Sequence, residues 1–167
     1  MARQDLQRQA RHGQRGFTLI ELMVTLTILA ILATVAMPLT QVAAKRNRET
    51  ALQQALWQIR NALDAYKKAV DEGKVQRQYG DNGYPATLAV LVDGVKDLRD
   101  PLNRKIYFLR RIPRDPMCDC PARRDADTWG KRSYASPPDR PSEGSDVYDV
   151  YSLSEEVGLN GQPYRNW

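Results

Sequence analysis

The sequence contains one long apolar run and, after it, a helical stripe. No Asp, Glu, Lys or Arg occurs from Leu22 to Ala44, and about 20 apolar residues suffice to cross a bilayer. Beyond this run, apolar residues recur at alternating four- and three-residue steps, the spacing of one helix face: Leu52, Leu56, Ile59, Leu63, Tyr66 and Val70. We therefore predict one helix from Phe17 to about Asp71, ending near Gly73.

The two halves of this predicted helix differ in character. Pro38 lies in the apolar half, where its ring removes one backbone hydrogen bond and clashes with the preceding turn, so we expect a kink there. In the second half a coiled coil would need a longer, capped pattern. The stripe is therefore expected to pack on the chain's own sheet, with these charged residues in solvent: Arg60, Asp64, Lys67, Lys68 and Asp71.

The C-terminal half alternates short apolar runs with turn-rich loops. A short helix is expected at 87–92, with Thr87 in the capping position. Strands are expected at 106–109, 132–135 and 147–152, and segments 113–128 and 136–146 are expected to be loops. The fold class that this pattern indicates is α+β, in which a long N-terminal helix packs on a small antiparallel sheet.

Glu21 is a lone acid at the start of the apolar run. A carboxylate inside a membrane costs a few kcal/mol unless a partner neutralises it, so its presence favours a functional role. Cleavage of the Gly16–Phe17 bond would expose an α-amine four residues before Glu21, about one helical turn away. That amine could neutralise Glu21 in the same chain or in a neighbour.

The residues Gly16-Phe17-Thr18-Leu19-Ile20-Glu21-Leu22 resemble the processing site of type IV pilins and of the pseudopilins of type II secretion. The resemblance implies that a prepilin peptidase cuts after Gly16 and that the new N-terminal Phe17 is methylated. It also implies that Glu21 guides docking of subunits into a helical filament. Pro38 fits as well, since these helices commonly carry a proline near that position.

Later segments resemble the major pseudopilin of type II secretion, namely 84–88, 112–116, 149–153 and the final Asn166-Trp167. The resemblance implies a pilin-like fold with a leader at 1–16, a transmembrane and filament-core helix at 17–44, and a periplasmic globular domain at 45–167. The expected partners are copies of the same chain, other pseudopilins, the prepilin peptidase, and an inner-membrane assembly platform with its cytoplasmic ATPase. The expected role is a structural subunit that drives export of folded proteins.

The charge of the chain is concentrated at its start. The formal net charge is +5, and residues 1–16 hold four Arg and one Asp, so the leader carries +3 of it and the remainder +2. Arginines before the apolar run favour a cytoplasmic N-terminus in a single-pass inner-membrane protein. No basic stripe with interleaved aromatic residues follows, so we expect no nucleic-acid partner.

Cys118 and Cys120 are the only cysteines. Their two-residue offset matches no zinc spacing. In an oxidising compartment a local disulfide is one alternative. Free thiols and, less favoured, metal binding are the others.

The resemblance implies a calcium ion in the loop that follows the strand at 147–152. Calcium takes six to eight oxygen ligands, several of them carboxylates. Glu156 falls about where the family has one aspartate, but Pro163 stands where another would be, and only Glu155 and Asn160 remain as candidates. We therefore predict no metal and no cofactor, and expect the loop to be ordered by packing of Leu159, Tyr164 and Trp167.

No catalytic set emerges from the sequence. The single histidine, His12, lies in the leader, so a histidine base is excluded from the processed chain. The acidic and basic residues of 110–127 predict a solvated, salt-bridged loop first and a contact between subunits second. Two rival functions remain: a type IV pilus subunit for adhesion, motility or DNA uptake, and a membrane-anchored periplasmic binding domain that never polymerises.

Overall fold

The computed structural model describes residues 16–77 and 80–167, except for the side chains of 35–39. The expected leader therefore lies almost entirely outside the described residues. Backbone contacts divide the chain into two compact units, Met1–Val42 and Ala43–Trp167.

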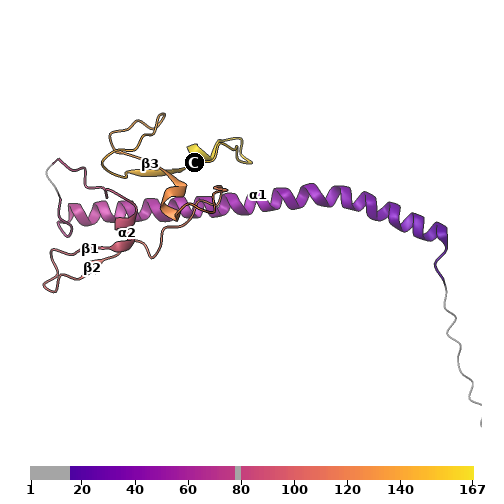
Figure 1. Ribbon diagram of the computed structural model, residues 1–167, viewed down its shortest axis with the longest axis horizontal. Coiled ribbons are helices and arrows are strands. Elements are labelled where there is room, and N and C mark those ends of the chain that lie inside the picture. Colours follow the sequence, from indigo (N-terminus) through magenta and orange to yellow (C-terminus); the bar gives the residue numbers. More distant parts are fainter. Residues whose placement is uncertain (1–15, 78–79) are drawn as a thin grey trace, which may run out of the picture. The chain divides into compact units, whose positions relative to one another are not determined.

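Helix α1 spans Leu19–Asp71 and contains 53 residues (Figure 1), which confirms the predicted long helix. Two residues after its last residue, Gly73 adopts the left-handed region with φ of 68°. Beside it, the amide of Lys74 donates to the carbonyl of Ala69 at 2.9 Å, so the last turn of α1 is closed by the backbone. Pro38 lies within the bounds of α1, and the kink expected there stays a prediction.

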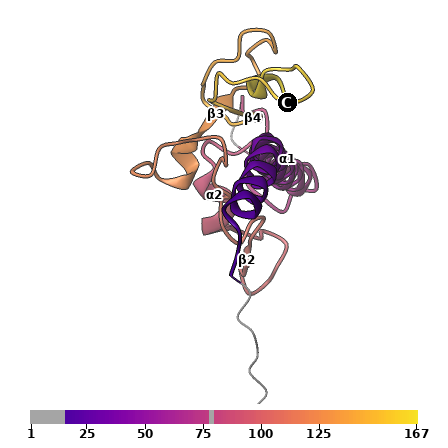
Figure 2. The ribbon, with the colours of Figure 1, turned by 90° about the vertical axis from the view of Figure 1, so that its right-hand side faces the viewer.

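The second unit arranges short elements around the C-terminal part of α1. Two antiparallel pairs form, β1 with β2 and β3 with β4, and in both views they lie to different sides of α1 (Figures 1 and 2). The elements are α2 (Ala89–Asp93), β1 (Val95–Lys96), β2 (Lys105–Ile106), the 3-10 helix η1 (Asp125–Thr128), β3 (Trp129–Arg132), β4 (Asp149–Ser152) and the 3-10 helix η2 (Tyr164–Asn166).

The predicted stripe of α1 forms the core of this unit. Leu52, Leu56, Ile59 and Leu63 are 0–3% exposed. They share one cluster with buried side chains from the later elements: Leu88, Leu91, Trp129, Val147, Val150 and Tyr164. Burial of each such side chain contributes about 1.5–3 kcal/mol, so packing along the stripe fixes the second half of α1 to the small strands.

The short elements lie close to their predicted positions, with four corrections. Helix α2 begins at Ala89, and no side chain caps it, so the predicted capping role of Thr87 was wrong. The backbone carbonyl of Thr87 accepts a hydrogen bond from the Val90 amide instead. The strand expected at 106–109 covers only Lys105–Ile106, because the amides of residues 108 and 109 both donate to the carbonyl of Leu91. The strand expected at 132–135 lies three residues earlier, as β3, and shares only residue 132 with the prediction. The strand expected at 147–152 covers only β4, Asp149–Ser152, because the amide of residue 147 donates to the Pro85 carbonyl instead.

The acidic loop at 113–128 is only partly solvated. Arg114 pairs with Asp125 at 3.3 Å and Arg124 with Asp127 at 2.9 Å, as expected of a salt-bridged loop. Asp115, however, is 1% exposed, and its carboxylate accepts hydrogen bonds from the Ser152 hydroxyl at 2.6 Å and the Met117 amide. These donors compensate its lost hydration, so Asp115 joins this loop to β4.

Cys118 and Cys120 form a disulfide, with their Cα atoms 5.3 Å apart. Of the three alternatives that the sequence left open, the structure therefore has the local disulfide. The bridge closes a short loop, directly after the buried Asp115.

Candidate functional site

Two of the described residues that precede α1, Gly16 and Phe17, show no close packing. Gly16 and Phe17 lie before the helix, and the side chain of Phe17 is 76% exposed. A Cβ atom added at Gly16 would meet no atom within 4 Å. The described fold therefore does not itself require a glycine at this position, which is consistent with recognition by another molecule.

Glu21 lies in the first turn of α1, where Thr18 caps the helix. The Glu21 amide donates to Oγ1 of Thr18 at 3.3 Å, and the Leu22 amide donates to the Thr18 carbonyl at 3.1 Å. The unpaired amides of a helix N-terminus favour a negative side chain nearby. Thr18 was missed as a candidate, although Thr-x-x-Glu before an apolar run is a sequence signal for a helix start.

The first part of α1 presents apolar side chains on every side. The exposed residues are Phe17, Leu19, Ile20, Leu22, Met23, Val24, Leu26, Ile28, Leu29, Ile31 and Leu32, at 50–79% exposure. The hydroxyls of Thr25, Thr27 and Thr34 donate to carbonyls three or four residues earlier in the same helix. Such bonds satisfy them without water, so this surface suits an apolar environment.

Among the described residues, no helix is both long enough and apolar enough to cross a membrane.

The loop after β4 does not gather its candidate calcium ligands. Glu155 and Glu156 are exposed, and the Asn160 side-chain oxygen accepts the amide of Gln162 at 2.9 Å. Among the residues described, no group of three or more His, Cys, Asp or Glu side chains is arranged so that it could hold a metal ion. Several carbonyls of this loop also have donors, which include the Tyr164 amide on the Glu156 carbonyl at 3.1 Å.

Two residues of α1 contact this loop instead. Nζ of Lys45 donates to the Val157 carbonyl at 2.7 Å. The Glu49 carboxylate accepts the Leu159 amide at 2.7 Å and the Tyr164 hydroxyl at 2.9 Å. A lysine ammonium on a loop carbonyl repels a divalent cation, so the residues present do not fit a calcium ion.

Lys45 and Glu49 were missed by the sequence analysis, although a signal for them exists. The stripe that begins at Leu52 extends backwards in the same alternating steps to Glu49 and then to Lys45. Both residues therefore face the side of α1 that the rest of the stripe buries. The same helical spacing, when charged residues are included in it, predicts that Lys45 and Glu49 contact the rest of the globular unit.

The expected apolar anchors of the loop are partly confirmed. Tyr164 is fully buried, and Trp167 packs against it with ring centroids 5.1 Å apart. Leu159 is 48% exposed, so its expected anchoring role was wrong. Burial, together with the hydrogen bond to the Glu49 carboxylate, raises the pKa of Tyr164 to about 12, because both favour the neutral phenol.

The side chain of Arg60 is partly buried and not solvated as expected. Its side chain is only 38% exposed and pairs through Nε with the Asp149 carboxylate at 2.8 Å. Its Nη2 donates to the backbone oxygen of Trp167 at 2.8 Å and to the Val150 carbonyl at 3.2 Å. The expectation of a solvated Arg60 was wrong, because β4 and the chain end provide acceptors within its reach.

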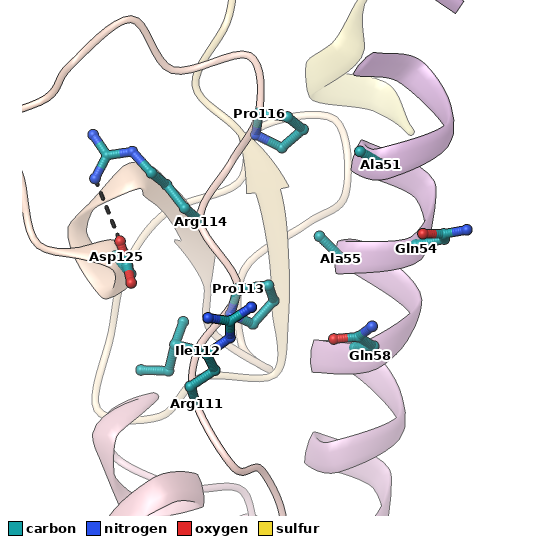
Figure 3. A pocket seen from close by; sticks show the side chains of 10 residues that line it. All are labelled: Ala51, Gln54, Ala55, Gln58, Arg111, Ile112, Pro113, Arg114, Pro116 and Asp125. Atoms are coloured by element: carbon teal, nitrogen blue, oxygen red, sulfur yellow. Dashed lines mark hydrogen bonds and ion pairs between the residues drawn. The ribbon is translucent and has the colours of Figure 1, made fainter. Parts of the chain in front are cut away.

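A groove of about 470 Å³ lies between α1 and the segment 111–116. Figure 3 shows Ala51 and Ala55 of α1 on one side, with Arg114 turned toward Asp125 on the other. Asp125 is the only acid in its lining, and it is already paired with arginine. The groove therefore offers no nucleophile–base pair for catalysis.

Comparison with known proteins identifies the N-terminal segment first. Residues 11–37 match the family described as Prokaryotic N-terminal methylation motif. This match covers Gly16, Phe17 and Glu21. It defines the class as proteins with a prepilin-type N-terminus.

Curated relatives extend the match along the chain. A protein of Vibrio cholerae named type II secretion system core protein G is 31% identical over 164 residues, which cover 92% of each chain. Proteins with the same name from Pseudomonas aeruginosa and Pectobacterium carotovorum are each 34% identical, with 87% and 65% of each chain covered. The chain belongs to the type II secretion system core protein G family, the major pseudopilins. No solved structure matches it significantly.

Proposed function

We propose that this chain is a structural subunit of a type II secretion pseudopilus, assembled through its N-terminal helix. Three parts are proposed: a leader at 1–16, a membrane and filament-core helix at 17–44, and a periplasmic globular domain at 45–167. The subunit has a mechanical and not an enzymatic role. Its filament drives export of folded proteins across the outer membrane.

The observation that carries this proposal is the uncovered apolar surface formed by Phe17 and the first part of α1, Leu19 to Leu32. Contiguous apolar patches of this kind on a single chain mark contact with other chains or with lipid. Lipid would cover the surface in the inner membrane before assembly, and equivalent helices of neighbouring subunits would cover it in the filament. The same surface thus serves both states.

Glu21 is proposed as the docking acid. In the membrane, the start of α1 partly compensates the charge of this carboxylate. In the filament, the amine of Phe17 from a neighbouring subunit would neutralise it. Pairing of the Phe17 amine of one subunit with the Glu21 carboxylate of the next favours insertion of a new subunit in one register. Only that register brings the amine and the carboxylate together.

The proposed partners follow from this assembly. They are other copies of the chain, other pseudopilins, the prepilin peptidase that cuts after Gly16, and an inner-membrane platform driven by a cytoplasmic ATPase. The proposed topology is single-pass, with a cytoplasmic N-terminus and a periplasmic C-terminal domain. No nucleic acid and no cofactor belong to this proposal. A type IV pilus subunit and a non-polymerising binding domain are less favoured, since the relatives are named as secretion proteins.

The test is to produce the full chain with an active prepilin peptidase and, as the matched control, with an inactive one. Intact-mass analysis should find a chain that starts at Phe17 in the first case and at Met1 in the second. Membranes from the first should yield ladders of crosslinked subunits. A chain that keeps residues 1–16 beside an active peptidase, or that is processed but yields no ladder, contradicts the proposal.

A further inference from the structure

The loop that follows β4 folds back on itself before the chain ends. Val157 and Pro163 form an isolated antiparallel bridge, and the Gly158 amide donates to the Gln162 carbonyl at 2.9 Å. Across its tip, the Gly161 amide donates to the Gly158 carbonyl at 3.0 Å. These bonds give the loop its shape, but they do not hold it against the rest of the unit.

The loop is held against the unit by α1. Lys45 and Glu49 are one helical turn apart, and each contacts a different part of the loop. The ammonium of Lys45 binds the Val157 carbonyl on the first side, at 2.7 Å. The carboxylate of Glu49 binds the Leu159 amide at 2.7 Å and, beyond the tip, the Tyr164 hydroxyl at 2.9 Å.

The contacts of Glu49 are buried or partly buried, whereas the contact of Lys45 with the Val157 carbonyl is exposed. Glu49 is only 9% exposed, and Tyr164 is fully buried. Hydrogen bonds to a charged group are shorter and stronger than neutral ones, and a buried charge that loses its donors is costly. The Lys45 ammonium also lies 5.9 Å from the centroid of the Tyr164 ring, which attracts a cation.

A divalent ion in such a loop would bind carbonyl and carboxylate oxygens and tie them together. Here the Val157 carbonyl binds an ammonium, and the Glu49 carboxylate binds two protein donors. Helix α1 thus supplies both the positive charge that contacts the loop carbonyl and the carboxylate that contacts the loop amide. The exposed Glu155 and Glu156 point to no shared partner in the described structure.

We propose that Lys45 and Glu49 form a clamp that orders the loop 154–163 in place of a calcium ion. The clamp makes the order of this loop, and the burial of Tyr164 below it, a property of the chain alone. The fold of the globular unit is then independent of the calcium concentration around it. This inference concerns the folded subunit and holds whether or not the chain polymerises.

The experiment uses the full processed chain in detergent micelles and follows thermal unfolding with calcium chloride or with a chelator. The wild-type melting temperature should be the same in both. Lys45→Met and Glu49→Leu should each lower it by roughly 2–4 °C, again without response to calcium. Arg46→Met, which removes an exposed neighbouring charge on α1, is the matched control and should melt as the wild type.

A milder variant keeps the test decisive if Glu49→Leu fails to fold. Tyr164→Phe removes one hydroxyl donor from the Glu49 carboxylate and leaves the ring in place, and it should lower the melting temperature by a smaller amount. Limited proteolysis within 153–163 should accelerate in Lys45→Met and not in Arg46→Met. A wild-type melting temperature that rises with calcium, or clamp variants as stable and protected as the control, would overturn the proposal.

Discussion

Arg60 and Trp167, which are 107 residues apart in the sequence, are joined by a hydrogen bond of 2.8 Å from Nη2 to the backbone oxygen. The same guanidinium holds Asp149 at 2.8 Å and the Val150 carbonyl at 3.2 Å. One side chain of α1 therefore binds both β4 and the chain end.

Replacement of Arg60 by Met should destabilise the globular unit by about 1–2 kcal/mol, because hydrogen bonds to charged groups contribute more than neutral ones while partial exposure weakens the ion pair. Thermal unfolding of the full processed chain in detergent measures the change. Lys68→Met is the control, since that side chain is 77% exposed. Equal melting temperatures for the two variants would mean that the contacts of Arg60 add no stability.

Replacement of Glu21 by Val should abolish filament assembly and leave membrane insertion and the globular fold intact. The change removes the carboxylate that would pair with the Phe17 amine of a neighbour. Thr18→Val is the matched control, since it removes only the Oγ1 that accepts the Glu21 amide. Crosslinked ladders should be lost with Glu21→Val and kept with Thr18→Val. Unchanged ladders with Glu21→Val would show that apolar packing alone drives docking.

Acid should destabilise the fold through Asp146. Burial alone would raise the pKa of this carboxyl, but hydrogen bonds from Asn82, Ser133 and the Tyr134 amide outweigh it and hold the pKa below its usual value. The native state thus favours the charged form. The resulting stability is present above the unfolded pKa of about 3.9 and is lost as the pH falls through the lower native pKa.

The measurement for Asp146 is the melting temperature as a function of pH. Asp146→Asn should be less stable near neutral pH and should lose less stability on acidification than the wild type. Asp139→Asn, at an exposed position, should retain the full wild-type dependence. If Asp146→Asn and the wild type lose stability in parallel, other carboxylates cause the acid sensitivity.

Alkaline pH should destabilise the fold through ionisation of Tyr164. The pKa of this phenol is raised to about 12, so the native state favours the neutral form. Its contribution is complete below the ordinary tyrosine pKa, near pH 10, and is lost as the pH rises toward 12. Tyr164→Phe should remove this component and should cost about 1 kcal/mol at neutral pH. Tyr107→Phe, at a 63% exposed position, is the control. An alkaline loss that persists in Tyr164→Phe would assign it to another group.

The features that the sequence predicted well are those with a repeating physical signal. The period of Leu52, Leu56, Ile59 and Leu63 predicted both α1 and its buried face, because helix geometry ties spacing to direction. The strand ends were predicted less accurately. Leu91, for example, accepts the amides of residues 108 and 109, and this long-range contact ends β2 early without a local cue.

Charged residues account for the main errors at the candidate site. Lys45, Glu49, Arg60 and Asp115 all look solvated in the sequence, because a charged side chain is rarely buried without partners. Their partners come from positions far along the chain, such as Val157 for Lys45 and Ser152 for Asp115. Only the folded arrangement brings donor and acceptor together.

The contacts of Lys45, Glu49 and Arg60 also decide how the globular unit responds to force. They fasten the last part of the chain to three points spread along α1. A pull on α1 would therefore load these points together and not one after another. The unit would then resist as a joint loaded in shear, instead of opening from the end of the chain.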